Sequence, residues 1–445
     1  MNQIAIGDAS AWVILDGQSV AAPYRRAAPF FTFGSGDLSQ EQLEISLAGT
    51  PAQITAALAT LQKVALRALA YARGEYAFPQ YLRFQQVASG AYFYAMLLSV
   101  DLAENPTGYR DHQKGSLLVT LHYTRPNYFD GPQTELPLTG RAGSNVTGGI
   151  LIKNHTDTDP TDGSTLLIIA ADALTDLPAP LRIELLNTQV GGTGWNRLLF
   201  GAYHHPTHTS ENPFFCHATD MSGGTQYFNA GAINSYYRTF TFTSSTYASF
   251  MTYPIPSSEI DDLDGRAYRP ILNLFNSHAY SDLHMRIRLL FGSYVLYVGD
   301  GVYCPSNYDY VLFPPVRLPP NQLLREVDPQ YVTVELQGLR EGGALASISS
   351  DQLQLFPVEN ALIFDQFITV SPADKLIYDA HQNLSNIRYG GSTEAVSHIR
   401  SGGPMLLYPG ENTRLFFNLY NTANRLYIDH TAQIRAYYRP RIRVL

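Results

Sequence analysis

Histidines and a cysteine gather in one short stretch, HHPTHTSENPFFCHATD, at residues 204–220. Neutral imidazole and thiolate groups are zinc ligands, and here they come from His204, His208, Cys216 and His217. A helix would bring the first two histidines to one face, but prolines interrupt any helix in this stretch. Histidines in such loops also occur as ordinary surface residues. The stretch therefore offers candidate ligands but no recognisable metal motif, and we assign no metal site to it.

Aspartates occur at close intervals in a second polar stretch, NHTDTDPTDGST, which holds Asp157, Asp159 and Asp162 ahead of Gly163. Carboxylates at near-alternate positions before a glycine turn are the ligands that calcium loops use. The spacing is not that of an EF-hand, and the closing bidentate glutamate is missing. A solvated linker over residues 151–165 is the alternative interpretation, and we adopt it.

Motifs of catalysis are missing from the sequence. It contains no G-x-S-x-G, no phosphate-binding loop ending in Gly-Lys-Ser/Thr and no dinucleotide fingerprint after a strand. We therefore predict no enzyme activity, no catalytic residue and no cofactor. The net charge of −8, without a basic stripe, argues against nucleic-acid recognition. No apolar run is long enough to insert into a membrane.

Aromatic residues replace charge in the composition: 15% of residues are charged, whereas the chain has 30 Tyr and 22 Phe. Most basic residues are arginines, and the only lysines are Lys63, Lys114, Lys153 and Lys375. Protein interfaces are enriched in Tyr, Phe and Arg and depleted in Lys and Glu. The composition therefore favours a chain that assembles with copies of itself. A genome that prefers arginine codons, or a thermophilic source, is the alternative explanation.

One amphipathic helix is predicted over residues 51–73, and it needs a sheet on which to pack. Thr50 suits the N-cap, Pro51 the first helical position and Gly74 the stop. Apolar residues recur at helical spacing, and those expected to be buried are Ile54, Leu58, Leu61, Ala65 and Leu69. Strand patterns flank the helix in AWVILDG, LEISLAG, YLRFQQV, AYFYAMLLSVDL and LLVTLHYTR. Residues 1–150 are thus predicted to form a β-sandwich with one flanking α-helix.

The remaining sequence is almost purely β in pattern. Short apolar strands bounded by Gly, Pro, Asn or Ser fill residues 166–365, which is typical of a jelly-roll β-sandwich. Residues 366–445 make a smaller C-terminal β domain, predicted to pack back on the first domain, so that the jelly roll is an insertion. The predicted fold class is therefore mainly β.

A β-hairpin is predicted near the C-terminus, in GGPMLLYPGENTRLFFNL. Its strands would be Leu406 to Tyr408 and Arg414 to Leu419, joined by a turn at Pro409-Gly410-Glu411-Asn412.

The LAGTP-helix-strand unit, together with this late hairpin, resembles tail structural proteins of long-tailed bacteriophages, in particular distal-tail or baseplate-hub proteins. A tail-tube subunit that carries outer domains is almost as similar. The resemblance implies a non-enzymatic virion structural protein, a homo-oligomer whose N-terminal sandwiches form a ring or tube as a hexamer or trimer. It implies other tail proteins as partners, a place in the virion tail and assembly in the host cytoplasm.

Subunit-interface residues are proposed on the helix at Arg67 and on the closing strand, where arginines lie at alternate or near-alternate positions: Arg435, Arg439, Arg441 and Arg443. A solvated edge kept soluble by charge is the alternative for the closing strand. The alternative function is a glycan-binding adhesin of a phage tail or cell surface, with a host-surface glycan as partner. A polysaccharide-degrading tail enzyme is a third hypothesis, which the low acidic content disfavours.

Overall fold

The structure is a computed structural model of the whole chain. It describes residues 3–443 except for the ranges that follow: 10, 16–23, 31–37, 86–89, 105–115, 140–144, 147–148, 154–165, 170–174, 189–194, 206–214, 256–265, 307, 319–331, 359–360, 365–373, 382–386, 390–394, 397–398, 403 and 422–430.

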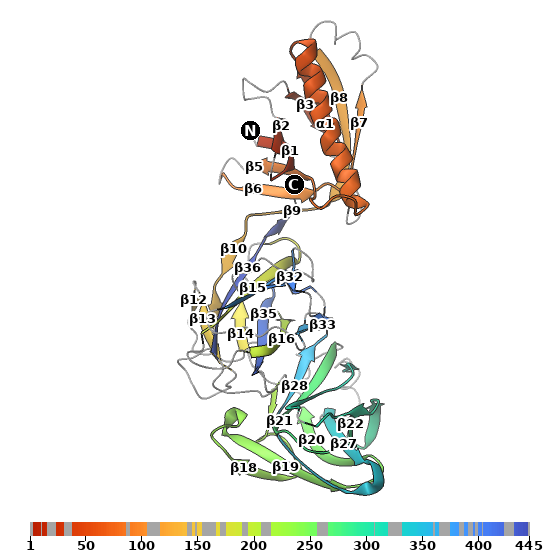
Figure 1. Cartoon of the computed structure of the whole chain (residues 1–445), viewed down its shortest axis with the longest axis vertical. Coiled ribbons are helices and arrows are strands. Elements are labelled where there is room, and N and C mark those ends of the chain that lie inside the picture. The colour runs from red at the N-terminus through yellow and green to blue at the C-terminus, as the bar shows by residue number, and fades with distance from the viewer. Residues whose placement is uncertain are drawn as a thin grey trace. The chain divides into compact units, whose positions relative to one another are not determined.

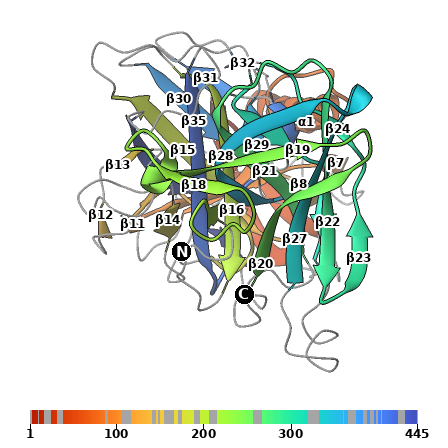
Figure 2. The same ribbon diagram turned by 90° about the horizontal axis from the view of Figure 1, so that it is seen from below.

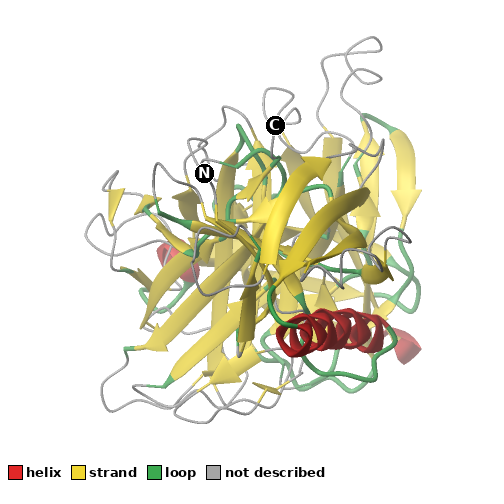
Figure 3. Cartoon of the chain, turned by 90° about the horizontal axis from the view of Figure 1, so that it is seen from above, coloured by secondary structure: helices red, strands yellow, loops and turns green. Residues whose placement is uncertain are grey.

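The predicted fold class, mainly β with one flanking helix, is confirmed. Strands make up nearly all of the regular structure in Figure 3, and α1 (Pro51–Ala72) is the only α-helix among the described residues. The chain folds into two compact units, and we describe each by itself. Unit 1 is Met1–Thr134, Leu174–Ala179 and Arg439–Leu445, and unit 2 is Glu135–Ala173 and Pro180–Tyr438. The domains predicted from the sequence, residues 1–150, 166–365 and 366–445, stay a prediction.

Unit 1 contains two antiparallel sheets. Sheet A has the order β2 (Ala11–Ile14), β1 (Gln3–Asp8), β5 (Tyr81–Gln85), β6 (Tyr92–Met96), β9 (Phe129–Asp130) and β37 (Arg441–Ile442). Sheet B has the order β3 (Tyr24–Phe30), β4 (Leu38–Ala48), β8 (Ser116–Pro126) and β7 (Ser99–Glu104). Figure 1 shows α1 lying along the strands of sheet B. The inner faces of both sheets and one face of α1 share a single hydrophobic core.

The helix begins and ends where the sequence predicts. Thr50 and Gln53 form a capping box, and Gly74 adopts φ +75° just after the last turn. The buried face is rotated from the predicted one, because the side chains that reach the core are Ile54, Ala57, Leu61, Val64 and Ala68. Leu69, which was expected to be buried, is 39% exposed. These residues are spaced alternately three and four apart, so they lie on one face of the helix. Two of them, Ala57 and Ala68, are small, and this allows the helix to lie close to the sheets.

The stretch AYFYAMLLSVDL is two strands and not one. Its first half is β6 in sheet A and its second half is β7 in sheet B. Leu97, between them, is fully buried, and its backbone N–H donates to the Gln80 carbonyl. A continuous apolar run therefore hides the corner at which the chain passes from one sheet to the other.

Unit 2 contains four further sheets. Sheet C runs β10 (Thr134–Leu136), β36 (Thr431–Tyr438), β15 (Ala179–Asn187), β30 (Lys375–Asp379), β31 (Ile387–Tyr389) and β32 (Ala395–Val396), with β13 (Ile150–Lys153) and β34 (Leu406–Leu407) attached. Sheet D runs β12 (Asn145–Val146), β11 (Leu138–Thr139), β14 (Leu166–Ile169), β35 (Asn412–Asn421), β16 (Trp195–His205), β29 (Ala361–Phe364) and β33 (Ile399–Gly402). The late strands thus share sheets with the early strands of the unit.

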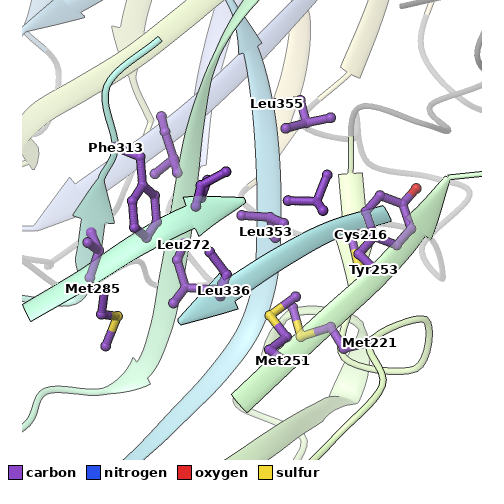
Figure 4. Close-up of a cluster of buried hydrophobic side chains, with 14 of the residues drawn as sticks. Cys216, Met221, Met251, Tyr253, Leu272, Met285, Phe313, Leu336, Leu353 and Leu355 are labelled. Carbon is purple, nitrogen blue, oxygen red and sulfur yellow. The ribbon is translucent and has the colours of Figure 1, made fainter. Parts of the chain in front are cut away.

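The other two sheets share one core. Sheet E runs β18 (Thr225–Phe228), β19 (Tyr236–Thr243), β28 (Leu345–Pro357), β21 (Ala267–Asn276) and β25 (Tyr310–Leu312), with β17 (Phe215–His217) and β26 (Val316–Arg317) attached. Sheet F runs β20 (Ala248–Ile255), β27 (Val332–Arg340), β22 (Leu283–Phe291) and β23 (Tyr294–Val298), with β24 (Val302–Tyr303) attached. Short 3₁₀ turns lie at Ile233–Ser235 and Glu341–Gly343. Figure 4 shows Leu272, Leu336 and Leu353 meeting in the core between the sheets.

The predicted C-terminal hairpin is wrong. The turn exists, since Gly410 adopts φ +73° and the Glu411 N–H lies 3.4 Å from the Tyr408 carbonyl oxygen. The strands on its two sides join different sheets, however, because β34 pairs with β15 whereas β35 pairs with β14 and β16. Met405 and Leu407 are buried, as are Leu415 and Phe417. The turn is therefore a corner between two layers, and each strand buries one face within the unit.

Candidate assembly surfaces

Most of the candidate metal ligands lie outside the residues whose side chains the structure describes. Asp157, Asp159, Asp162 and His208 lie outside the described residues, and the structure describes only the backbone of His204, on β16. Among the residues that the structure does describe, no group of His, Cys, Asp and Glu side chains could hold a metal ion.

Cys216 and His217 belong to the core of unit 2. Both are buried on β17, which pairs with β28. Figure 4 places Cys216 beside Tyr253 among apolar side chains. Burial raises the pKa of the Cys216 thiol well above its usual range, so the thiolate that a metal would need is disfavoured. These two candidate ligands therefore lie on a strand whose side chains fill a core.

Arg67 has partners within unit 1. Its Nη1 lies 3.4 Å from Asp8 Oδ2, and its guanidinium lies 5.3 Å from the centre of the Tyr76 ring. The Asp8 carboxylate is nearly buried, and Gln80 Nε2 also donates to it at 2.9 Å. Arg67 keeps 29% of its side chain exposed, and its proposed place in a subunit interface stays a prediction.

The closing arginines do not share one strand, contrary to the sequence prediction. Arg435 lies on β36 in unit 2, whereas Arg439, Arg441 and Arg443 belong to unit 1. The strand stops before Pro440, which cannot donate a ladder hydrogen bond. A hydrogen bond to the Tyr437 side chain raises the pKa of Arg435. The role of these arginines in contacts between subunits remains a prediction.

Arg441 ties the C-terminal strand into unit 1. Its Nε lies 3.0 Å from Asp130 Oδ1, and its guanidinium lies 4.3 Å from the Tyr128 ring centre. Its Nη1 donates to the Pro178 carbonyl, and its backbone N–H donates to Thr175 Oγ1. Arg441 thus fastens β37 to β9 and to residues 175–178 through its side chain and its backbone.

The outer face of sheet A is a surface that the sequence reasoning missed. Arg83 lies between two rings, 4.3 Å from the centre of Trp12 and 4.4 Å from that of Tyr92. Tyr94 stands next to Trp12 at 5.9 Å and to Tyr81 at 6.2 Å between ring centres. The signal was present in YLRFQ and YFYAM, where alternate residues are aromatic or basic on the face opposite the core.

Edge strands carry most of the large apolar side chains that unit 2 exposes. On β23, Tyr294 is 71% exposed and Val295, Leu296 and Val298 are more than two fifths exposed. Figure 2 shows β23 as the outer neighbour of β22. On β18, at the edge of sheet E, Phe228 is 70% exposed. Natural proteins usually blunt such edges with charge, so exposed apolar edges indicate contact with other chains.

Comparisons with known proteins gave structural neighbours only. No family model matches the chain, and no curated protein matches it. The chain is similar to a chain of the phage P2 baseplate in its activated conformation with Ca, at 9% identity and TM-score 0.31 over 100% of both chains. The same baseplate with Sr gives 10% identity and TM-score 0.19 over 79% of this chain and 98% of that one.

A third neighbour is the infectious bursal disease virus VP2 subviral particle, at 10% identity and TM-score 0.18, covering 70% of this chain and 79% of the other. The neighbours named here are thus parts of phage and virus particles. At TM-scores this low, the likeness establishes neither a common ancestor nor a common function. In the part of the chain that the structure describes, no helix has the length and hydropathy needed to cross a bilayer.

Proposed function

We propose that the chain is a non-enzymatic structural protein of a virion, built to assemble with copies of itself. The observation that carries this proposal is the set of exposed apolar side chains on edge strands β18 and β23, which a protein working alone would be expected to cover or charge. The lysine-poor, tyrosine-rich composition points the same way.

The finer proposal is a subunit of a phage tail ring or tube, of the distal-tail or tail-tube type, with unit 2 as the outer domain. Its support is the sequence resemblance together with the organisation of unit 1, a sandwich flanked by the capped helix α1. Unit 2 lies between two segments of unit 1 in sequence, as an outer domain inserted into a ring domain would. Other tail proteins are the further partners proposed.

Assembly of the purified full chain tests the proposal. Light scattering and negative-stain electron microscopy, at rising protein concentration, should show rings or tubes of defined subunit number. A monodisperse monomer at high concentration would overturn it. Co-purification with neighbouring tail proteins, after co-expression, tests the finer assignment to a tail.

Glycan binding is a second candidate function, favoured by an aromatic row on the outer face of sheet E. Tyr227, Tyr237 and Phe275 stack in sequence, at 5.4 Å and 4.3 Å between ring centres. The β21–β28 register shifts around Phe275, and Tyr227 is 46% exposed. The apolar face of a sugar ring can extend such a stack. Binding of surface polysaccharide by the full chain, lost in Tyr227→Ala, would support this function.

A further inference from the structure

Arg83 is unusual among the cations of unit 1, because two aromatic rings contact its guanidinium. The centres of the Trp12 and Tyr92 rings lie 4.3 Å and 4.4 Å from its Cζ atom. Cation–π contacts of this kind restrict the orientation of the group. A planar guanidinium held in this way presents its nitrogen edge in one direction, and that geometry suits a carboxylate.

The room for this arrangement comes from β1. Ala5 stands opposite Arg83 in the ladder, and Gly7 stands opposite both Trp12 and Tyr81. These small residues let Arg83 reach across the strand to the indole ring. Gly7 adopts φ +142°, and a Cβ there would lie 2.2 Å from the Ala11 carbonyl oxygen. The backbone therefore admits only glycine at this position.

Arg83 lacks an acidic counterpart within the described residues. Neither an ion pair nor a hydrogen bond joins it to another residue described in the structure, and its Nε is buried without an acceptor. A buried donor that loses water and gains no partner is destabilising, and more so when it is charged. Arg67 and Arg441 in the same unit both face carboxylates, so Arg83 differs from its neighbours.

The surface around Arg83 has the composition of an interface centre. Most of the partly exposed residues of this face are of types common at interfaces, namely Trp12, Tyr81, Tyr92, Tyr94 and Met96, and Ile14 and Gln85 share the face. Trp, Tyr and Arg are the residues that most often dominate the energy of protein contacts. No described lysine or glutamate lies on this face of β1, β2, β5 and β6, and the acid that stands opposite Tyr94 on β9, Asp130, is already paired with Arg441.

The outer face of sheet B has the opposite character. Its outward residues include Gln40, Gln42 and Ser46 beside the apolar Leu38 and Leu118, and it carries the carboxylates of Glu44 on β4 and Asp101 on β7. His122 stands between the two strands, opposite Asp101. No ion pair joins either carboxylate to another described residue. Because both sheets turn their inner faces to one core, the arginine face and the acidic face point away from it.

We infer that the outer face of sheet A in one copy of the chain packs against the outer face of sheet B in a second copy, with Arg83 paired to Glu44 and Asp101. The occupant is a second copy because unit 1 carries both halves of the pair on different surfaces. A contact between two different faces is head-to-tail, and it closes into a ring when the rotation between copies allows it. The inference rests on the proposed function and adds the residues that join the copies.

Charge reversal tests the pairing. Arg83→Glu places like charges opposite each other between copies, and so does the double variant Glu44→Arg with Asp101→Arg. Each protein alone should associate at least about tenfold more weakly than the wild type. An equimolar mixture of the two proteins should assemble again, because every contact in an alternating array then joins opposite charges. Native mass spectrometry resolves the mixed species, and failure of the mixture to assemble would overturn the pairing.

A matched control and a second variant keep the test decisive. Glu341→Arg changes the net charge by the same amount on an exposed turn of unit 2, and it should leave association unchanged; equal weakening would overturn the assignment to these faces. If Arg83→Glu does not fold by circular dichroism, Arg83→Gln replaces it and should weaken association at least about tenfold as well. A wild-type monomer would refute the proposed function and this inference together. A wild-type oligomer that tolerates both Arg83 variants would refute this inference alone, as would Arg83-dependent binding of a free anionic glycan without any effect on assembly.

Discussion

Two buried carboxylates, Glu41 in unit 1 and Asp351 in unit 2, have different surroundings. In unit 1, Glu41 and Arg125 form an ion pair whose side chains are 1% and 3% exposed. Arg125 Nε donates to Glu41 Oε2 at 3.1 Å, a second nitrogen meets the other carboxylate oxygen, and Phe129 stacks on the guanidinium at 4.3 Å. Both hydrogen-bonding edges of the carboxylate are therefore occupied.

In unit 2, no described cation pairs with the buried carboxylate of Asp351. Oδ2 accepts from the Ile233 N–H at 3.2 Å, and Oδ1 has no hydrogen-bond partner among the described residues. Burial raises the pKa of Asp351 to about 7, and the nearby carboxylate of Asp309 also raises it. The two carboxylates are about equally buried, but only Asp351 has its pKa raised in this way, and this carboxyl makes the stability of unit 2 depend on pH.

The largest effect on stability should come from placing an unpaired carboxylate in the core of unit 1. Leu61 is fully buried in the seam between α1 and the sheets, so Leu61→Asp puts an unpaired charge there. The cost is about 4 kcal/mol or more, and unit 1 should not fold. Leu66→Asp is the matched control, because Leu66 is 66% exposed on the same helix. Circular dichroism melts compare the two, and similar melting temperatures would contradict the assigned core face.

Removing the cation of the buried pair should have the next largest effect. Arg125→Met leaves the Glu41 carboxylate buried without its partner and should cost about 3 to 5 kcal/mol in the free energy of unfolding. The double variant Glu41→Gln with Arg125→Met should recover a large part of that loss, because no charge then remains buried. Chemical denaturation measures both. Equal losses in the single and double variants would show that packing, and not charge, is what Arg125 supplies.

Unit 2 should lose stability as pH rises between about 4 and about 7. The native state holds the Asp351 proton more tightly than the unfolded chain, whose pKa is 3.8, so protonation favours folding across this window. Asp351→Asn should remove this part of the slope and raise the free energy of unfolding at pH 8 by a few kcal/mol, on the order of that pKa shift. Denaturation at pH 5 to 8 tests this.

The Arg125→Met variant is the control for this pH dependence. Because Arg125 lies in unit 1, the stability of unit 2 should keep its wild-type dependence on pH in this variant. If the free energy of unfolding of Asp351→Asn depends on pH as in the wild type, another group must cause that dependence. The Asp309 carboxylate would then be the first one to substitute. Ordinary carboxylates that are paired in the native state oppose this slope at lower pH: burial raises the pKa of Glu184, but hydrogen bonds from Lys375 and Arg182 lower it overall.

The helix and the fold class could be predicted from the sequence because their signals are local. A cap at Thr50, a proline at the first helical position and a glycine stop fix α1 within a residue or two. The buried face of α1 could not be predicted as well, since Ala57 and Ala68 are buried only because the sheets approach closely there. The false hairpin has the same origin: a turn at Gly410 is local, whereas the choice of sheet for β34 and β35 depends on distant strands.

The arginine face shows why site residues are harder to predict. Arg83 and Tyr92 are close in sequence and lie on neighbouring strands of one ladder, so a hairpin pattern could have brought them together. Trp12 comes from the start of the chain and reaches Arg83 only across β1. The sequence does not encode that approach locally. The composition predicts a chain that assembles with copies of itself. It does not indicate which arginine to propose as an interface residue, and the contacts of Arg83 in the structure are what suggest one.

The smallest expected effect concerns Arg67, whose ion pair with Asp8 is less buried than the pair of Arg125 with Glu41. Its partner Asp8 is nearly buried, but the arginine is 29% exposed, so solvent screens the pair. Gln80 remains as a donor to Asp8 when Arg67 is removed. Arg67→Ala should therefore lower the free energy of unfolding by less than about 1 kcal/mol. We expect weaker association as well, because the exposed part of the guanidinium is available to a neighbouring copy. Light scattering beside a thermal melt separates the two effects, and an unchanged oligomer mass would confine Arg67 to its contact with Asp8.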